Sequence, residues 1–270
     1  LRTGLVALGL VCACATSLAD ITAIVAVEPT AKKAAHTILR SQMEAGLGKA
    51  AGQTASVTVS EDLADVMRAT RSAGYDVFIG PAQVAASALD RGYELVGANH
   101  KSQKYVLVAA PTTAAVGALK GGRLYLPQQD SIYTYMARGM LNEAGLSFKD
   151  LKQVQYEKYP QAGLTALLLG STDATVVRED DWAEWSAAQP KAAKVLASSQ
   201  PVPGGFTVVV KKDLPPELRS RVAQWFATAS EPSGLALATL KPETAQYKRV
   251  AELGLFTPVA LPGVQRVNAK

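Results

Sequence analysis

Tyr75-Asp-Val-Phe-Ile-Gly80 runs straight into Pro81-Ala-Gln83. The apolar part of this stretch predicts a buried strand that ends on glycine. Proline is tolerated in the first turn of a helix, so we expect a helix to continue over 82–90. A buried strand that turns at once into a helix is typical of α/β proteins, in which helices cover a mostly parallel sheet.

The same alternation of strand and helix extends outward from this junction. Towards the amino terminus, the hydrophobic pattern predicts strands over 21–27 and 55–59 and helices over 30–49 and 62–72. Towards the carboxyl terminus, two further strands are expected over 94–97 and 104–109. The pattern then restarts, with strands over 123–126, 154–156, 172–177 and 206–210 and helices over 130–143, 161–169, 215–229 and 243–255.

Breaks near Pro111 and over 201–205 divide the chain into two α/β lobes. Two crossings between the lobes would form a hinge, with a cleft between them. The predicted fold class is α/β and bilobal, with two mostly parallel sheets, flanking helices, a hinge and an interlobe cleft. We expect a signal peptide over 1–19, the first part of lobe 1 over 20–110, an inserted lobe 2 over 111–204, and the return to lobe 1 with a carboxyl-terminal tail over 205–270.

The composition agrees with a folded protein and excludes several function classes. The chain has 270 residues, of which 48% are hydrophobic and 19% charged, too apolar for intrinsic disorder. Its net charge of +5 is spread along the sequence, and aromatic residues make up only 6%. Because nucleic-acid binding needs clustered basic or stacked aromatic side chains, we expect no nucleic-acid partner.

Residues 1–19 have the pattern of a secretory signal peptide. A basic residue precedes an uncharged apolar run over 5–15, and small residues follow it. Cleavage after Ala19 would leave a periplasmic protein without cysteine, because Cys12 and Cys14 lie in this segment. A lipid anchor on Cys14 is the alternative, although the residues before it match the lipidation pattern poorly.

Few residues of the sequence suggest catalysis. The mature chain has no cysteine nucleophile, and His36 and His100 lack the spacing of metal ligands. Neither a serine-hydrolase motif nor a nucleotide-binding glycine motif is present. The acidic run over 179–181 could bind a metal, but a solvated helix start before Trp182 is the commoner arrangement. We therefore expect no enzyme activity, no catalytic residue, no metal and no cofactor.

Three strand-to-helix turns are better suited to binding. They contain Glu28-Pro-Thr30, Gly80-Pro-Ala-Gln83 and Gln128-Gln-Asp-Ser-Ile-Tyr-Thr134. Ligands of open α/β sheets collect at the carboxyl ends of strands, and helix amino termini bind anions through unpaired N–H groups. In the alternative, Thr30 and Ser131 (or Asp130) only cap their helices, and Gly80-Pro81 is only a tight turn.

A series of short segments carries a resemblance to a known family. They are Tyr75-Asp-Val-Phe-Ile-Gly-Pro-Ala-Gln83, Ala85-Ala-Ser-Ala88, Gly92-Tyr93, Leu119-Lys-Gly-Gly-Arg-Leu-Tyr-Leu126, the helix start at Ser131, and Ala166-Leu-Leu-Leu-Gly-Ser-Thr-Asp-Ala174. Together they resemble the substrate-binding proteins of phosphate/phosphite/phosphonate-type ABC transporters. The resemblance implies the type II periplasmic-binding-protein fold, a small anionic ligand and a permease partner in the inner membrane.

The second-lobe helix start departs from the Ser-Thr-Ser-Gly-like run that is usual in that family. Ser131-Ile-Tyr-Thr134 keeps the first hydroxyl and replaces the rest with bulkier groups, and Tyr159 stands where a polar residue such as histidine is often found. Tyr133, Tyr135 and Tyr159 could flank an organic ligand or lie in the core. Arg178, just after a strand, could neutralise an anion, although an exposed surface arginine is more common.

We expect a monomeric periplasmic protein that closes two lobes on a small oxyanion (phosphate-, phosphite- or phosphonate-like) or a small anionic organic molecule, and then docks on an ABC permease. One alternative is the ligand-binding module of a sensor or redox system without transport, and another is an enzyme on the same fold. The expected ligand-binding residues are Thr30, Gly80, Pro81, Ala82, Gln83, Ser131, Ile132, Tyr133, Thr134 and Tyr159.

Overall fold

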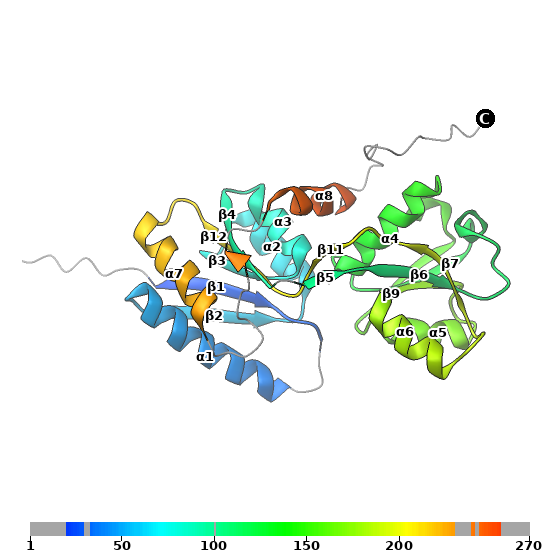
Figure 1. The fold of residues 1–270 in the computed structure, drawn as a ribbon, viewed down its shortest axis with the longest axis horizontal. Helices are drawn as coiled ribbons and strands as arrows, with labels where there is room; N and C mark the ends of the chain where they lie inside the picture. The colour runs from blue at the N-terminus through cyan, green and yellow to red at the C-terminus, as the bar shows by residue number, and fades with distance from the viewer. Residues whose placement is uncertain (1–19, 30–32, 100, 230–238, 241–242, 255–270) are drawn as a thin grey trace, which may run out of the picture.

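The computed structural model describes residues 20–29, 33–99, 101–229, 239–240 and 243–254. Within these residues, each of two lobes contains one sheet, and a two-stranded ribbon lies between the lobes (Figure 1). This arrangement confirms the bilobal α/β fold expected from the sequence. The expected signal peptide over 1–19, with Cys14 and the cleavage after Ala19, lies outside the described residues, as do Thr30 and His100.

The sheet of the first lobe has the strand order β13-β4-β12-β3-β1-β2. β1 pairs in parallel with β2 and β3, whereas β12 is antiparallel to both β3 and β4. Most of its strands are short runs rich in valine, isoleucine and alanine, the composition of buried strands. They are β1 (Ile21–Ala26), β2 (Ala55–Ser60), β3 (Val77–Gly80), β4 (Tyr93–Ala98), β12 (Thr207–Lys211) and β13 (Thr239–Leu240).

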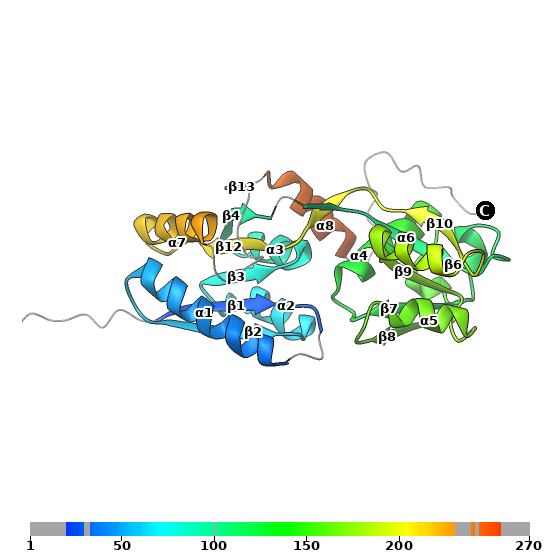
Figure 2. The same cartoon turned by 60° about the horizontal axis from the view of Figure 1, so that its bottom comes forward.

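This sheet separates two apolar cores, because successive side chains of a strand point to opposite faces. Ile24 and Phe78 pack in the core with α2, α3 and α8, whereas Val25 and Ile79 pack with α1 and α7. Figure 2 shows α1 and α7 on one face of the sheet and α3 on the other. The helices are α1 (Lys33–Ala51), α2 (Leu63–Ser72), α3 (Ala82–Leu89), α7 (Pro216–Thr228) and α8 (Ala245–Gly254).

The sheet of the second lobe has the order β10-β6-β9-β7-β8. β7 is parallel to β8 and β9, and β6 is antiparallel to β9 and β10. Helices α4 (Ile132–Glu143), α5 (Ala162–Leu168) and α6 (Glu179–Ala188) flank it. The strands are β6 (Tyr105–Ala109), β7 (Arg123–Pro127), β8 (Gln153–Glu157), β9 (Ala174–Arg178) and β10 (Lys194–Ser198).

Two features of the sheets differ from the sequence-based expectation. Both sheets are mixed rather than mostly parallel, because strands that follow a crossing between the lobes enter their sheet in the reverse direction. The strand expected over 104–109 at the end of the first part of lobe 1 is β6, which pairs with β9 and β10 in the second lobe. Its hydrophobic pattern predicts a strand correctly but carries no information about which sheet it joins.

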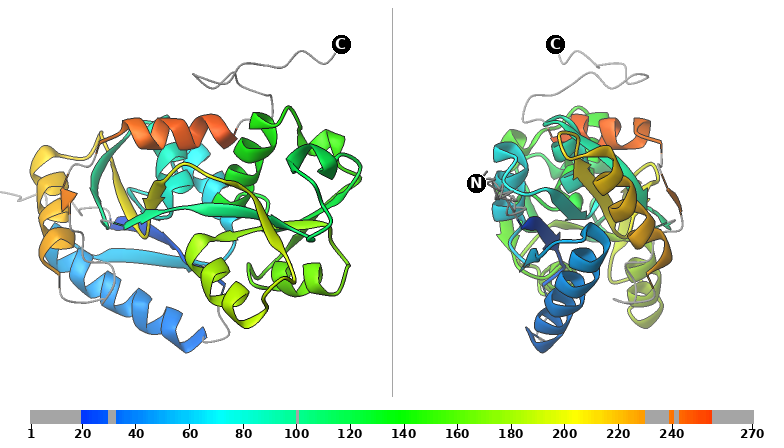
Figure 3. Two further views of the ribbon diagram at one scale, coloured as in Figure 1. Left: turned by 45° about the vertical axis from the view of Figure 1, so that its right-hand side comes forward. Right: turned by 90° about the vertical axis from the view of Figure 1, so that its left-hand side faces the viewer.

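Two crossing segments form the ribbon between the lobes. β5 (Lys101–Gln103) pairs antiparallel with β11 (Val202–Gly204), a pairing that no periodic pattern in these short segments predicts. Helix α8 contacts β11, α3 of the first lobe and α4 of the second. Figure 3 shows α8 lying along the first lobe and reaching towards α4. The approach is close at Gly139 in α4, where an added Cβ atom would lie 3.0 Å from Leu253 Cδ2.

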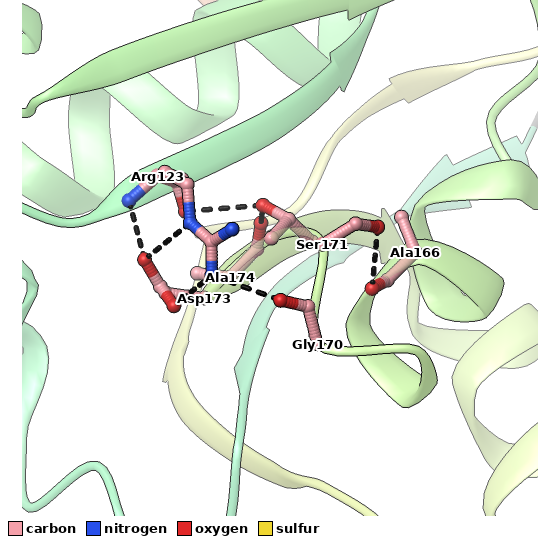
Figure 4. A network of polar contacts seen from close by, with 7 residues as sticks. Arg123, Ala166, Gly170, Ser171, Asp173 and Ala174 are labelled. Carbon is pink, nitrogen blue, oxygen red and sulfur yellow. Dashed lines mark hydrogen bonds and ion pairs between the residues drawn. The ribbon is translucent and has the colours of Figure 1, made fainter.

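An ion pair fixes the start of β7 to the turn before β9 (Figure 4). Asp173 Oδ2 accepts from the backbone N–H of Arg123 at 2.7 Å, and Asp173 Oδ1 accepts from the Arg123 guanidinium at 2.9 Å. The same guanidinium donates to the Gly170 carbonyl at 2.9 Å. These bonds with Arg123 lower the pKa of Asp173. Asp173, which belongs to one of the segments that carried the family resemblance, is therefore structural.

Asp173→Asn should destabilise the protein by about 1 kcal/mol at neutral pH, because the exposed ion pair is weak but the charge-assisted bond to a backbone N–H is stronger. The midpoint of thermal unfolding should fall by about 2–4 °C. Since the folded-state pKa of Asp173 is lowered, its contribution is present above the unfolded-state pKa of about 3.9 and is lost as the pH falls through the folded-state value. The difference between wild type and variant should therefore shrink on acidification. Asp213→Asn, at an exposed ion pair 3.8 Å long, is the control with no expected effect.

Candidate functional site

A pocket of about 340 Å³ lies between the lobes. Its walls come from the segment after β1, the starts of α2, α3 and α4, the ribbon strands and the ends of β8 and β9, so that both lobes contribute. Most of these are the carboxyl ends of strands or the helix starts that follow them, where open α/β sheets bind ligands. Its polar and charged members are Glu28, Gln83, Gln103, Gln128, Ser131, Lys158 and Arg178, and its aromatic members are Tyr105, Tyr133 and Phe206.

Two helix starts, one from each lobe, line this pocket. The first residues of a helix have backbone N–H groups without an intrahelical acceptor, and the helix dipole adds a partial positive charge there. No other described residue accepts a hydrogen bond from these groups at the starts of α3 and α4. The pocket-lining residues that carry them are Ala82, Gln83, Ile132 and Tyr133.

Ser131 caps α4 and stabilises the conformation of its first turn. Its Oγ accepts from the Thr134 N–H at 3.3 Å and donates to the Pro127 carbonyl. The Thr134 hydroxyl donates to the Gln128 carbonyl at 2.9 Å and is fully buried. Ser131 therefore caps α4 and also lines the pocket, and the two hydroxyls hold the turn that leaves the N–H groups of Ile132 and Tyr133 unpaired.

Two buried polar atoms beside the helix starts have no hydrogen-bond partner among the described residues. They are Gln83 Oε1 and the Tyr133 hydroxyl, whose residues are 1% and 3% exposed. Gln83 Nε2 donates across the cleft to the Asp130 carbonyl at 3.2 Å, which fixes the orientation of its amide. Burial raises the pKa of Tyr133, so its hydroxyl stays protonated and can donate. Unpaired buried polar groups are costly, and a bound polar ligand would relieve that cost.

Arg178 is one of the two cations among the residues that line this pocket. It ends β9, and its side chain is 30% exposed. Its guanidinium donates to Asp181 at 2.9 Å and, across the cleft, to Glu28 at 3.4 Å. The Tyr133 ring packs edge-on against Tyr105, with ring centres 5.1 Å apart, and completes this wall.

The acidic run after Arg178 is a helix start, as expected. Glu179, Asp180 and Asp181 form the first turn of α6, where negative charge complements the helix dipole. Among the described residues, no cluster of three or more histidine, cysteine, aspartate or glutamate side chains could hold a metal ion.

A side-chain amide holds the lobes together at another part of the cleft. Gln128 Oε1 accepts from the Leu63 N–H at 3.0 Å, and Gln128 Nε2 donates to the Glu61 carbonyl at 3.0 Å. We call this pair of bonds the clasp. Gln128 has a positive φ of 35°, an uncommon conformation for a residue with a side chain. Lys158 adds an ion pair to Glu61 at 2.7 Å, which raises the pKa of Lys158.

The structure brings most of the expected site residues together. Pro81, Ala82, Gln83, Ser131, Ile132 and Tyr133 all line the pocket. Gly80, Thr134 and Tyr159 are not among its lining residues. Gly80 packs in the sheet, where an added Cβ would lie 3.0 Å from Ala26 Cβ. Tyr159 is 45% exposed, and its neighbours Lys158 and Pro160 line the pocket instead. Tyr135 lies in the apolar core.

Sequence reasoning underestimated or missed the charged part of the site. Arg178 was expected to be more commonly an exposed surface residue, but it lines the pocket and is mostly buried. Its position just after a strand was the available signal, because ligand-binding residues gather at that end of α/β sheets. Glu28 follows β1 in the same way and lay within one of the three turns singled out. Gln128 also lies within one of these turns, although its sequence does not predict the two bonds of the clasp, and no sequence signal pointed to Lys158.

A family comparison decides what kind of protein carries this site. The sequence profile described as ABC transporter, phosphonate, periplasmic substrate-binding protein matches residues 23–251. The chain belongs to this family. It is a periplasmic substrate-binding protein that works with an ABC transporter permease and binds a small anionic ligand, and it is not an enzyme. None of the described helices combines the length and the hydropathy that a membrane crossing requires.

Solved structures with the same fold are distant in sequence. PhnD1 from Prochlorococcus marinus (MIT 9301), in complex with methylphosphonate, is 14% identical with a TM-score of 0.65, and the match covers 87% of this chain and 97% of that chain. XAC2383 from Xanthomonas citri, bound to chloride ion, is 14% identical with a TM-score of 0.66, over 87% and 96% of the chains. PA3383 from Pseudomonas aeruginosa, a binding-protein component of an ABC phosphonate transporter, is 14% identical with a TM-score of 0.62, over 88% and 86%. These likenesses show the fold. A comparison with curated proteins finds no match.

Proposed function

We propose that this substrate-binding protein captures an anionic organophosphorus compound, a phosphonate or a close relative, in the pocket between the lobes. The observation that carries the proposal is the pairing of two helix starts, from opposite lobes, with unpaired N–H groups at one pocket. Charge-assisted hydrogen bonds from such groups to an oxyanion are strong, and they act on both lobes at once. The ligand would therefore hold the lobes closed.

The charged side chains support an anion as the ligand. Arg178 and Lys158 both line the pocket, and Arg178 can offer a bidentate pair of donors that matches two oxygens of a phosphonate group. Glu28 already accepts one hydrogen bond from the Arg178 guanidinium across the cleft. An entering anion competes with this carboxylate. The closed, ligand-bound monomer would then be the form that docks on the permease.

The proposal predicts binding and a characteristic behaviour of Tyr133→Phe. Ligand-free Tyr133→Phe should be at least as stable as the wild type, because the variant loses a buried hydroxyl that has no partner. Its affinity for methylphosphonate should fall about fivefold to tenfold, the value of one hydrogen bond of about 1–1.5 kcal/mol. Thermal unfolding without ligand and calorimetric titration with methylphosphonate, phosphite, phosphate, sulfate and acetate measure both effects.

Two outcomes would count against this function. If sulfate or acetate bound at least as tightly as every phosphorus oxyanion, the ligand class would be wrong. If Tyr133→Phe left the affinity for the tightest phosphorus ligand unchanged, the pocket would be the wrong site. Tyr135→Phe is the matched control, because Tyr135 lies on the same helix but in the core, away from the pocket lining.

A further inference from the structure

The volume of the pocket is too large for a bare oxyanion in a closed binding protein. At about 30 Å³ for each water molecule, 340 Å³ holds roughly eleven waters. Methylphosphonate, with a single carbon on phosphorus, would displace fewer than half of them. Pockets of about 300–1,000 Å³ are typical of sites for organic molecules of drug size.

This volume belongs to lobes that are already in contact. The clasp joins Gln128 to the turn before α2, Gln83 donates to the Asp130 carbonyl, and Lys158 pairs with Glu61. Each of these contacts joins one lobe to the other, at separations of 2.7 to 3.2 Å. Further closure around a small ion would drive these contacting groups into one another, so the space that remains is available to the ligand.

The chemistry of the wall indicates what fills that space. One set of lining groups, the unpaired N–H groups and Arg178, can donate hydrogen bonds to an anionic group of the ligand. A second set is apolar and comes from the start of α2, the segment after β1 and the ribbon with the residues that follow it: Val27, Pro29, Leu63, Pro203 and Phe206. Water trapped against such a surface gains few hydrogen bonds, so an apolar group of the ligand would displace it favourably.

From these observations we infer that the ligand is an organophosphorus anion with a substantial organic group, at least as large as a phenyl ring, rather than a bare oxyanion or methylphosphonate. The inference rests on the proposed function and adds the size and polarity of the ligand. Its phosphorus group lies at the two helix starts, and its organic group lies against Phe206 and the apolar residues around it. A phosphonate and a phosphate monoester share this chemistry.

Calorimetric titration of the periplasmic protein with four probes tests the inference. Benzylphosphonate or phenyl phosphate should bind at least tenfold more tightly than methylphosphonate, and the stronger of the two identifies a carbon or an oxygen link to phosphorus. Benzenesulfonate, which has the ring without phosphorus, should bind more weakly than both. Equal or tighter binding of methylphosphonate would overturn the inference while leaving the proposed function intact. Failure of every phosphorus probe, or a preference for benzenesulfonate, would overturn the proposed function and the inference together.

Two variants locate the organic group. Phe206→Ala should reduce the affinity for the aromatic probe at least fivefold more than the affinity for methylphosphonate, and thermal unfolding of the ligand-free variant reports whether it is folded. Val27→Phe, which narrows the pocket from the segment after β1, should exclude the aromatic probe and still bind methylphosphonate. If both variants kept the wild-type ratio of the two affinities, the organic group would lie elsewhere and the inference would be wrong.

Discussion

Arg178→Met is expected to weaken methylphosphonate binding about a hundredfold, a loss of about 2.7 kcal/mol in binding free energy. The guanidinium is 30% exposed and lines the pocket, so its hydrogen bonds to an anion are only partly screened by water. Its loss also leaves Glu28 and Asp181 without their cation, and the two carboxylates would then repel the ligand. Calorimetric titration at constant salt measures the change.

A second cation of the pocket is the matched control. Lys158→Met removes a charge from a side chain that is 47% exposed and is already paired with Glu61, so we expect a loss of only a few fold. Thermal unfolding of both ligand-free variants shows whether the fold is retained. Equal losses for the two variants would mean that the site responds to net charge alone and that Arg178 does not contact the ligand.

Glu28→Gln should raise the affinity for methylphosphonate, whereas Arg178→Met should lower it. Glutamine keeps the size of the side chain but no longer competes with an anion for Arg178, which lies 3.4 Å from the carboxylate. Affinity for methylphosphonate should therefore rise severalfold. If it fell instead, the Glu28 carboxylate would contact a donor on the ligand, and Arg178 would not be available to the anion in the way described above.

Gln128→Ala should shift the ligand-free protein towards an open form and weaken ligand binding about tenfold. The variant removes both bonds of the clasp, each with a net contribution of about 0.5–1.5 kcal/mol. A protein that is closed for a smaller fraction of the time binds more weakly in proportion to that fraction. Small-angle X-ray scattering with and without methylphosphonate measures the opening, and titration measures the affinity.

The control for the clasp is the neighbouring side chain. Gln129 is exposed and does not line the pocket, so Gln129→Ala should change neither measurement. Gln128→Asn tests the geometry, because asparagine tolerates a positive φ but is too short to reach both Glu61 and Leu63. It should behave like the alanine variant. If Gln128→Ala kept the wild-type scattering and affinity, the clasp would be a minor contact and closure would depend on the ligand alone.

The sequence predicted local structure well because local structure depends on local patterns. Strand β3 and helix α3 form as the run of apolar residues followed by Gly80 and Pro81 indicates. The starts of α3 and α4 both line one pocket. Each follows a strand of an α/β unit, and the carboxyl ends of such strands are where α/β sheets bind ligands. The sequence could not decide between a pocket and a surface position for Arg178, because burial of a charge depends on distant partners, here Glu28 across the cleft.

The features that sequence could not supply all depend on pairing between distant segments. β6 has the apolar pattern of any buried strand, and only its partners β9 and β10 assign it to the second lobe. The ribbon of β5 and β11 has three residues on each side, too few for a periodic signal. The clasp depends on the positive φ of Gln128, which the flanking sequence does not predict. It also depends on backbone groups of the other lobe, which lie far away in the sequence.

The position of helix α8 determines which parts of the two lobes move least when the cleft opens. The helix touches α3, α4 and the ribbon strand β11, so the element that links both lobes lies beside the connection about which they turn. A body that rotates moves least near its axis, and the contact between Gly139 and Leu253 can persist there while the cleft opens. Elements that α8 does not contact, such as β7 and β8, then move farther when the lobes separate. A fluorescent pair placed across the clasp would report opening, whereas a pair across α8 and α4 would report almost none.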